Sequence, residues 1–174
     1  MLVDLATERQ EFLQIPLSQG YTALVDLSDR ELVTQHNWHA WARDGLVYAV
    51  TNINRNSQRR QISMHRLILG IADTNKPLVD HINHNGIDNR RANLRLASSS
   101  QNNANQALSK GAKTSKYKGV SWHSSTNKWQ ASIRVKGKQT YLGLFTSEEK
   151  AAVAYNQAAI IHFGDFAFLN DEAN

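Results

Sequence analysis

A polar stretch just past the middle of the chain limits the size of any single core that this sequence can build. Residues 106–116 are rich in Ser, Lys, Ala and Gly and include one large apolar residue. Such a composition is typical of a linker, because it offers little apolar surface to bury. The 174 residues are therefore expected to form two small units. The predicted parts are a first domain over residues 1–105, a linker over 106–114, a second domain over 115–170 and a tail over 171–174.

The residue types present restrict the chemistry. The chain has no Cys, which excludes disulfides, thiolate zinc sites and cysteine nucleophiles. A metal ion would have to be held by His, Asp, Glu, Asn or backbone oxygen. No stretch approaches the roughly 20 apolar residues of a membrane span, and no basic start with an apolar run marks a signal peptide. We therefore expect a cytoplasmic protein without a membrane partner.

Positive charge is concentrated in two acid-free stretches. Residues 45–72 contain four Arg, and residues 110–147 contain eight Lys or Arg, whereas the net charge of the whole chain is only +5. Ser, Asn, Gln, Trp and Tyr lie between these cations. A Lys or Arg placed on a phosphate releases a counterion, so such stretches suit a nucleic-acid backbone. Nucleic acid is the predicted partner.

The first domain has the pattern of a mostly antiparallel sheet. Residues 21–27 and 46–53 have strand composition, and Asp-Gly at residues 44–45 predicts a turn before the second of these strands. Residues 64–71 then predict a short helix. A short strand begins at residue 77 and leads into the densest polar cluster of the chain.

The second domain has the pattern of a small sheet with one helix. Apolar and polar residues alternate over residues 129–136, which predicts a strand with one apolar and one basic face. Residues 118–123 and 139–144 are expected to flank it as strands. A helix is predicted from a capping box at residues 146–149 to a C-cap at Gly164. The chain is thus predicted to be α+β, with a three-stranded antiparallel sheet packed on one helix in its second part.

The polar cluster at residues 79–95 has the sequence V-D-H-I-N-H-N-G-I-D-N-R-R-A-N-L-R. A calcium loop is a poor match, because its first ligand position holds His81 and its twelfth holds Ala92. A zinc site with His81 and His84, and with His65 as a third ligand, has no evident fourth ligand. A polar turn that satisfies its own backbone explains the Asn residues but not Asp80-His81 at the end of an apolar strand.

Phosphodiester hydrolysis accounts for the adjacent Asp and His. The reaction needs a base to deprotonate water and a cation at the scissile phosphate and its leaving oxygen. Neighbouring residues of a strand point to opposite sides, so Asp80 and His81 can reach different ligands. This segment is therefore a candidate nuclease site.

The same segment resembles a known family. His81, Asn93 twelve residues later and Asn102 nine residues after that are similar to the His-Asn-His (HNH) motif of phage and intron homing endonucleases. The flanking residues 64–67 and 93–95 also look like the flanks of that motif. The resemblance implies a beta-beta-alpha-metal motif core over residues 64–105, preceded by an antiparallel sheet, and endonuclease activity at preferred sites in double-stranded DNA.

The resemblance also implies roles for particular residues. Asp80 and Asn102 would coordinate one divalent metal ion per active site, magnesium first and manganese second, because both supply hard oxygen ligands. His81 would be the general base, and Asn93 would orient its imidazole and brace the loop. Two arginines are further candidates, in contact with phosphates: Arg66 and Arg95.

The second domain resembles the apetala/ethylene-response-factor (AP2/ERF) DNA-binding domain. The similarity lies in Lys118-Gly119-Val120, in Trp129, in residues 141–145 and in the Ala pairs of the helix that ends at Gly164. In that family the polar sheet face enters the major groove, which admits a two-stranded ribbon. The matching candidate DNA contacts are Lys118, Ser121, His123, Ser132, Arg134, Gln139 and Tyr141, with Lys136 and Lys138 nearby for phosphates.

Two functions follow as expectations. The first is a metal-dependent endonuclease whose second domain holds double-stranded DNA. The alternative is a non-catalytic DNA-binding transcriptional regulator, in which the nuclease motif only adds affinity. No obligate protein partner is indicated, and no long heptad pattern announces a dimer, so a monomer or weak dimer is expected.

Overall fold

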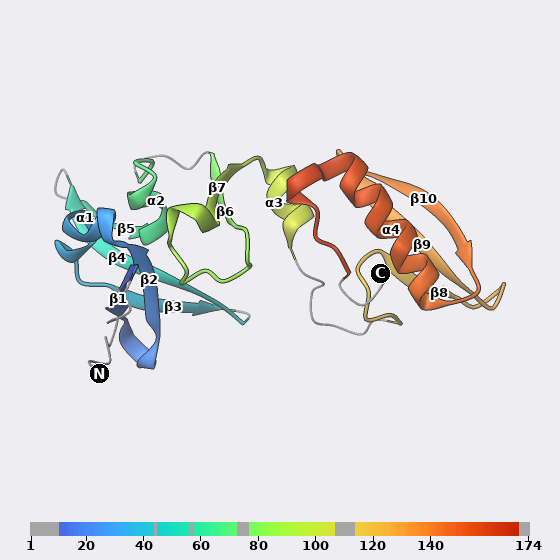
Figure 1. Cartoon of the computed structure of the whole chain (residues 1–174), viewed down its shortest axis with the longest axis horizontal. Helices are drawn as coiled ribbons and strands as arrows, with labels where there is room; N and C mark the ends of the chain where they lie inside the picture. The colour runs from blue at the N-terminus through green and yellow to red at the C-terminus, as the bar shows by residue number, and fades with distance from the viewer. Residues whose placement is uncertain (1–10, 44, 56–57, 73–76, 107–113, 171–174) are drawn as a thin grey trace, which may run out of the picture. The chain divides into compact units, whose positions relative to one another are not determined.

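The computed structural model describes residues 11–43, 45–55, 58–72, 77–106 and 114–170. These residues form an α+β fold of several small antiparallel sheets and few helices, as predicted (Figure 1). The chain divides into two compact units, the first ending at Leu96 and the second beginning at Ala97. Most of the predicted linker and all of the predicted tail lie outside the described residues.

The first unit begins with two antiparallel sheets. Strands β1 (Phe12–Pro16) and β2 (Thr22–Asp26) pair with each other, and β3 (His39–Arg43), β4 (Leu46–Arg55) and β5 (Gln58–Ser63) form a three-stranded sheet in chain order. The alternate burial along β2 matches the alternation of apolar and polar residues in its sequence. The two predicted strands of this region are therefore present as β2 and β4.

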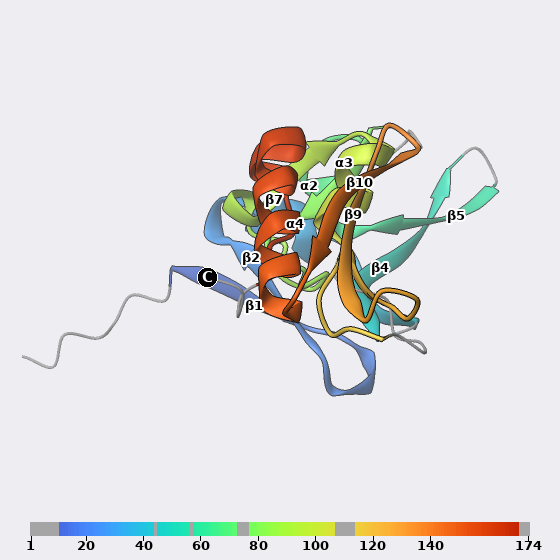
Figure 2. The same cartoon turned by 90° about the vertical axis from the view of Figure 1, so that its right-hand side faces the viewer.

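The β4–β5 hairpin is longer than its neighbour β3. The last pairing of β3 with β4 joins His39 to Val50, while β4 and β5 remain paired from Val50 out to Arg55. Beyond Val50 the hairpin is therefore a two-stranded ribbon, which Figure 2 shows reaching past the rest of the first unit.

Two helices pack against these sheets, α1 (Arg30–Thr34) and α2 (Met64–Ile68). The short 3-10 helix η1 (Ser18–Gly20) connects β1 to β2, and η2 (Leu27–Asp29) connects β2 to α1. Helix α2 ends earlier than the predicted residue 71, because Gly70 adopts a φ of +70° that ends the helix.

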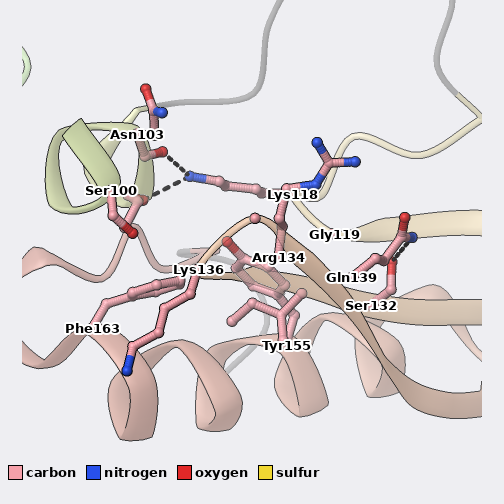
Figure 3. Close-up of a pocket in the computed structure, with 13 residues that line it drawn as sticks. Ser100, Asn103, Lys118, Gly119, Ser132, Arg134, Lys136, Gln139, Tyr155 and Phe163 are labelled. Carbon is pink, nitrogen blue, oxygen red and sulfur yellow. Dashed lines mark hydrogen bonds between the residues drawn. The ribbon is translucent and has the colours of Figure 1, made fainter.

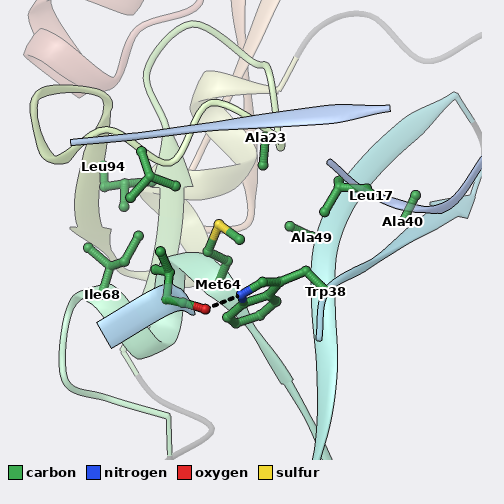
Figure 4. Close-up of a cluster of buried hydrophobic side chains, with 10 residues drawn as sticks. Leu17, Ala23, Trp38, Ala40, Ala49, Met64, Ile68 and Leu94 are labelled. Atoms are coloured by element: carbon green, nitrogen blue, oxygen red, sulfur yellow. Dashed lines mark hydrogen bonds between the residues drawn. The ribbon is translucent and has the colours of Figure 1, made fainter. Parts of the chain in front are cut away.

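Met64 lies at the centre of the first core. Its side chain is fully buried among apolar residues from β2, β4 and both helices (Figure 4). The indole of Trp38 packs beside it and donates its Nε1–H to the carbonyl of Val33 at 2.8 Å. Met64 and Ile68 therefore anchor α2 in the core of the first unit.

Strands β6 (Leu78–His81) and β7 (Leu94–Ala97) form a small sheet of their own, and the loop between them includes the 3-10 helix η3 (Arg91–Asn93). This loop binds β2, because Leu24 donates to the Ile87 carbonyl at 2.9 Å and accepts from the Asn89 amide at 2.8 Å. The polar cluster predicted as the reacting site is thus held on a buried strand.

The second unit contains α3 (Ser99–Asn105). This helix begins with a capping box between Ser98 and Gln101. The carbonyl of Ala104 accepts a hydrogen bond from the Phe168 amide at 3.3 Å. Helix α3, which the sequence analysis placed in the first domain, therefore packs against the segment that closes the second unit.

The rest of the second unit matches the predicted sheet and helix. Strands β8 (Val120–His123), β9 (Lys128–Val135) and β10 (Lys138–Phe145) are antiparallel with β9 in the middle, and α4 (Glu148–Phe163) leads to η4 (Gly164–Phe166). The N-cap of α4 is Ser147, one residue later than the predicted capping box, because its hydroxyl accepts the Lys150 amide. No helix in the described part of the chain is long and apolar enough to cross a membrane.

Small residues let α4 lie close to this sheet. The buried side chains between them are largely Ala, with Tyr117 in one buried cluster and Tyr155 in the other. A Cβ at Gly119 would come within 2.0 Å of the Tyr155 ring and 2.6 Å of the Ser132 carbonyl oxygen. Gly119 is therefore a packing requirement of this unit as well as a position of positive φ.

Candidate active site

Asp80 and Arg95 form an ion pair between β6 and β7. The Nε and the terminal nitrogen of Arg95 both lie 2.7 Å from the same carboxylate oxygen, Oδ2. Asp80 is only 6% exposed, so the pair is held in a site that largely excludes water. The charge-assisted hydrogen bond from Nε restricts the direction of the carboxylate.

His81 lies in a cluster of aromatic rings. Its ring centroid is 5.0 Å from that of His65 and 5.8 Å from that of Tyr48, and the residue is 6% exposed. Burial lowers the pKa of His81 below its ordinary value, although a polar contact from Asn89 and the charges of Asp80 and Asp88 oppose the shift. The imidazole is therefore neutral near pH 7 and has the protonation state that a general base requires.

Asn93 braces the loop that follows His81. Its Oδ1 accepts the backbone amide of Asn83 at 2.9 Å, and its Nδ2 donates to the Asp88 carbonyl at 2.8 Å. These side-chain bonds go to the loop backbone and not to the ring of His81. The bracing that we predicted for Asn93 has a visible basis, whereas the orientation of the imidazole by Asn93 stays a prediction.

Two buried carboxylates hold the loop from either side. Asp88 accepts both Nε and a terminal nitrogen of Arg90 at 2.8 Å, and the hydrogen bond from Arg90 lowers the pKa of Asp88. Asp29 pairs with Arg91 across 2.8 and 2.6 Å, which ties the loop to the segment before α1. A buried charge that lost its partner would be costly, so these pairs keep the loop in one conformation.

Gly86 allows the loop to approach β4. A Cβ there would lie 2.4 Å from the Val47 carbonyl oxygen and 2.7 Å from the Tyr48 ring. The same ring contacts His81, so the loop, β4 and the candidate base are packed as one group. Any side chain at residue 86 would force these parts away from one another.

The candidate metal ligands lie in different units. Asp80 is on β6 of the first unit, and Asn102 is half-buried on α3, which belongs to the second. Within the described residues, no three His, Cys, Asp or Glu side chains gather in a metal-binding group. Asp80 has a carboxylate and Asn102 an amide oxygen, and their coordination of one ion stays a prediction.

Arg66, a predicted phosphate contact, binds the backbone beside α2. One terminal nitrogen donates to the Pro77 carbonyl and the other to the Ile71 carbonyl, both at 3.1 Å. These bonds close the connection between α2 and β6. A phosphate contact by Arg66 stays a prediction, and the phosphate would have to share these two nitrogen donors.

Most of the predicted DNA contacts of the second unit share one face of its sheet. Strand register pairs Ser132 with Tyr141 and Arg134 with Gln139, and Tyr141 is 59% exposed. The amide of Gln139 donates to the hydroxyl of Ser132 at 3.0 Å. The predicted residues on this face, which we call the sheet face, are Ser121, His123, Ser132, Arg134, Gln139 and Tyr141.

The predicted lysine contacts differ from one another. Lys118 places its ammonium on the C-terminal end of α3, where it donates to the carbonyls of Ala104 at 2.7 Å and Gln106 at 2.6 Å. Burial lowers the pKa of Lys118 to about 8. Lys136 lies in the turn before β10, and Lys138 pairs with Val135 on the side opposite the sheet face.

A hollow of about 800 Å³ lies beside the sheet face in the second unit (Figure 3). Arg134, Lys136 and Gln139 line it from the sheet, and Ser100 and Asn103 line it from α3. Its lining is basic and rich in hydrogen-bond donors, as a DNA phosphate would need.

Several residues that surround the candidate sites were not among the predicted site residues. Tyr48 and Asn89 lie against His81, and Gln130 joins the sheet face opposite Ser121. The alternation of residues 129–136 already placed Gln130 on the polar face. No local pattern marks Tyr48, because its contact with His81 depends on the pairing of distant segments.

The chain is similar to two kinds of known protein. It is 31% identical over 163 residues to "Uncharacterized HNH endonuclease L560" of Acanthamoeba polyphaga mimivirus, covering 91% of this chain and 80% of that protein. It is 33% identical over 165 residues to the AP2-like ethylene-responsive transcription factor AIL6 of Arabidopsis thaliana, covering 82% of this chain and 27% of that protein. The AP2-like factor PLT2 of the same plant is 49% identical over 69 residues, which are 38% of this chain and 12% of that protein.

The two kinds of relative differ in how much of their own length the chain spans. The chain covers less than a third of either plant protein but most of the viral one. No family model and no solved structure matches it. The first unit holds the buried Asp80 and His81, and the second is a three-stranded sheet with helices. The chain belongs to the HNH endonuclease family and combines that part with an AP2-like part.

Proposed function

We propose that the chain is a divalent-metal-dependent endonuclease that hydrolyses phosphodiester bonds at preferred sites in double-stranded DNA. The observation that carries this proposal is the buried pair at the end of β6, where His81 is kept neutral beside the carboxylate of Asp80. A neutral imidazole can take a proton from water. The relationship to a protein named as an HNH endonuclease supports the reaction, and the AP2-like similarity supports DNA as the substrate.

Each residue of the site has a distinct task in this proposal. His81 takes the proton of the attacking water, and Asn93 holds the loop that positions it. Asp80 and Asn102 would hold one divalent ion, magnesium or manganese, for which carboxylate and amide oxygens are suitable donors. Such an ion, when bound, supplies positive charge for the scissile phosphate and its leaving oxygen. Arg95 fixes the Asp80 carboxylate.

The second unit supplies most of the affinity in this proposal. Its sheet face is polar and exposed, and Arg134 and Gln139 lie side by side on it. Tethering the cleaving unit to a bound unit raises its effective concentration at the DNA. Modest preferences in the two units can therefore combine into preference for a site.

Replacement of the base tests this function. Purified wild type and His81→Ala are incubated with plasmid DNA and magnesium or EDTA, and products are resolved on native and denaturing gels. We expect magnesium-dependent cleavage that falls roughly 100-fold or more in His81→Ala, with DNA binding retained. His162→Ala, an exposed histidine on α4, is the matched control and should cleave normally. Equal cleavage by His81→Ala would remove the proposed base.

A second candidate is a non-catalytic transcriptional regulator. It is favoured by the plant relatives, which are named transcription factors, and by the open sheet face. The two candidates differ in the response to metal. Intact DNA under every divalent ion, with an affinity that magnesium does not change, would support the regulator over the nuclease.

A further inference from the structure

The β4–β5 ribbon is a part of the first unit to which the proposed mechanism gives no task. Beyond Val50 no third strand of the described part of the chain joins it, and its strand pairs are those between β4 and β5. It lies in the acid-free stretch over residues 45–72. A two-stranded ribbon that leaves its sheet has a size that the major groove of DNA accommodates.

Strand register shows which side chains share a face of this ribbon. Asn52 pairs with Gln61 and Asn54 pairs with Arg59, and these four residues alternate with the others along their strands. All four are exposed. Asn and Gln can bind adenine, and Arg can bind guanine, through two hydrogen bonds in the major groove. We call the face formed by Asn52, Asn54, Arg59 and Gln61 the amide face.

The opposite side of the ribbon has a different character. Thr51 and Ile62 pair there and are buried at its base, while Ile53 is paired with the exposed Arg60. Arg59 and Arg60 are thus adjacent cations of equal charge on opposite faces. Neither forms an ion pair with another residue in the described part of the chain.

The amide face continues towards the candidate active site. From Asn52 and Gln61 it passes the Val50–Ser63 pair and reaches Tyr48, whose ring is 5.8 Å from that of His81. A hollow of about 300 Å³ lies along this part of the face, and Tyr48, Gln61, Ser63 and His65 are among its lining residues. The amide face therefore lies on the side of β4 that carries Tyr48, and the Tyr48 ring contacts that of the buried His81.

We propose that the β4–β5 ribbon is a second DNA-recognition element, whose amide face contacts base edges in the major groove beside the bond to be cut. The proposal rests on double-stranded DNA being the partner, as the proposed function requires. Tyr48 and Asn54 are six residues apart on β4, which is about 20 Å of strand. That length matches roughly six base-pair steps. The contacted bases are thus expected within roughly six base pairs of the cleaved phosphate, with adenine and guanine preferred.

Selection of duplexes from a random library tests this element without any need for cleavage. The full chain is used with His81→Ala, so that bound DNA stays uncut, and is compared with the same chain carrying Asn52→Ala with Gln61→Ala, Arg59→Ala or Arg60→Ala. All of these side chains are exposed, so thermal unfolding should be unchanged. Arg60→Ala is the matched control, because it removes the same charge from the other face.

We expect the parent chain to enrich two blocks of sequence, one for each unit. The Asn52→Ala/Gln61→Ala variant should lose preference roughly tenfold or more at adenines of one block and keep the other, and Arg59→Ala should lose a guanine of that block. Arg60→Ala should lower affinity without changing either block. Identical preferences in all variants, or equal changes in Arg59→Ala and Arg60→Ala, would overturn the proposal.

Cleavage mapping then separates this inference from the proposed function. If the wild type cuts DNA, the lost block should lie within roughly six base pairs of the cut; a block farther away would contradict the placement of the amide face beside His81. If the wild type cuts nothing but the block still depends on the amide face, the ribbon is a recognition element and only the nuclease proposal fails.

Discussion

The candidate functional side chains are buried in the first unit and exposed in the second. In the first unit, Asp80 and His81 are each 6% exposed and are surrounded by an ion pair and aromatic rings. On the sheet face of the second unit, Arg134, Gln139 and Tyr141 are exposed. The first arrangement sets the protonation state of the His81 imidazole and the direction of the Asp80 carboxylate, as a catalytic site requires. The second leaves donors available to a large, hydrated partner.

The difference extends to how each unit is held together. The site loop of the first unit is fixed by buried polar groups, among them Asp29, Asp88 and Asn93. The second unit brings its helix close to its sheet through Ala residues and Gly119. The first unit should therefore respond to changes of charge, and the second to changes of volume.

A volume change at Gly119 gives the largest expected effect. Gly119→Ala places a methyl group 2.0 Å from the Tyr155 ring at a φ of +77°, so it combines overpacking with backbone strain. We expect a loss of roughly 3 kcal/mol or more from the stability of the second unit. Hydrogen exchange resolved to peptides measures this loss in the second unit and shows whether the first is unchanged.

Gly137→Ala is the control for this change. Its φ is +80°, but a Cβ there meets nothing within 4 Å, so only the backbone strain of roughly 1–2 kcal/mol remains. Equal losses in the two variants would mean that the close approach of α4 to the sheet contributes nothing.

A change of charge at His65 gives the next largest effect. Burial, with the charges of His81 and Arg66, lowers the pKa of His65 to about 3. Below about pH 6.5 the unfolded chain binds a proton at His65, whereas the folded chain binds it only near pH 3. The contribution of His65 to the free energy of unfolding is therefore complete above pH 6.5 and is lost as the pH falls towards 3. Between pH 7.5 and pH 5 the loss attributable to His65 is about 2 kcal/mol.

Urea unfolding at the two pH values checks this assignment. His65→Gln can still hydrogen-bond to Ser63, as the ring does at 3.1 Å, but does not titrate, so its stability should fall less than that of the wild type. His162→Gln, at an exposed position on α4, should fall as the wild type does. The same fall in His65→Gln as in the wild type would show that burial of His65 is not the cause.

Local patterns predicted the second unit well. The alternation over residues 129–136 corresponds to β9, and the helix ends at Gly164 as its C-cap position indicated. These features depend on neighbours along the chain. The helix α3 was assigned to the first domain because the resemblance placed Asn102 there, whereas its packing depends on Phe168 and Lys118, far along the sequence.

The candidate site could be predicted only in part. The position of Asp80 and His81 at the end of a strand follows from the apolar residues before them. The burial of His65 and the contact of Tyr48 with His81 do not follow, because they depend on how β4, α2 and β6 pack together. Sequence spacing predicted the candidate reacting groups but not the surroundings that set their protonation.

The smallest expected effect separates two cations that the sequence analysis treated alike. Arg134 is exposed on the sheet face, so Arg134→Ala should weaken DNA binding and lower the slope of log affinity against log salt concentration by about one. The ammonium of Lys118 is bound to carbonyls at the end of α3. Lys118→Ala should therefore leave the salt slope unchanged while lowering the stability of the second unit. Titrations of one duplex at several salt concentrations measure both slopes, and a reduced slope in Lys118→Ala would show that this lysine leaves α3 to bind phosphate.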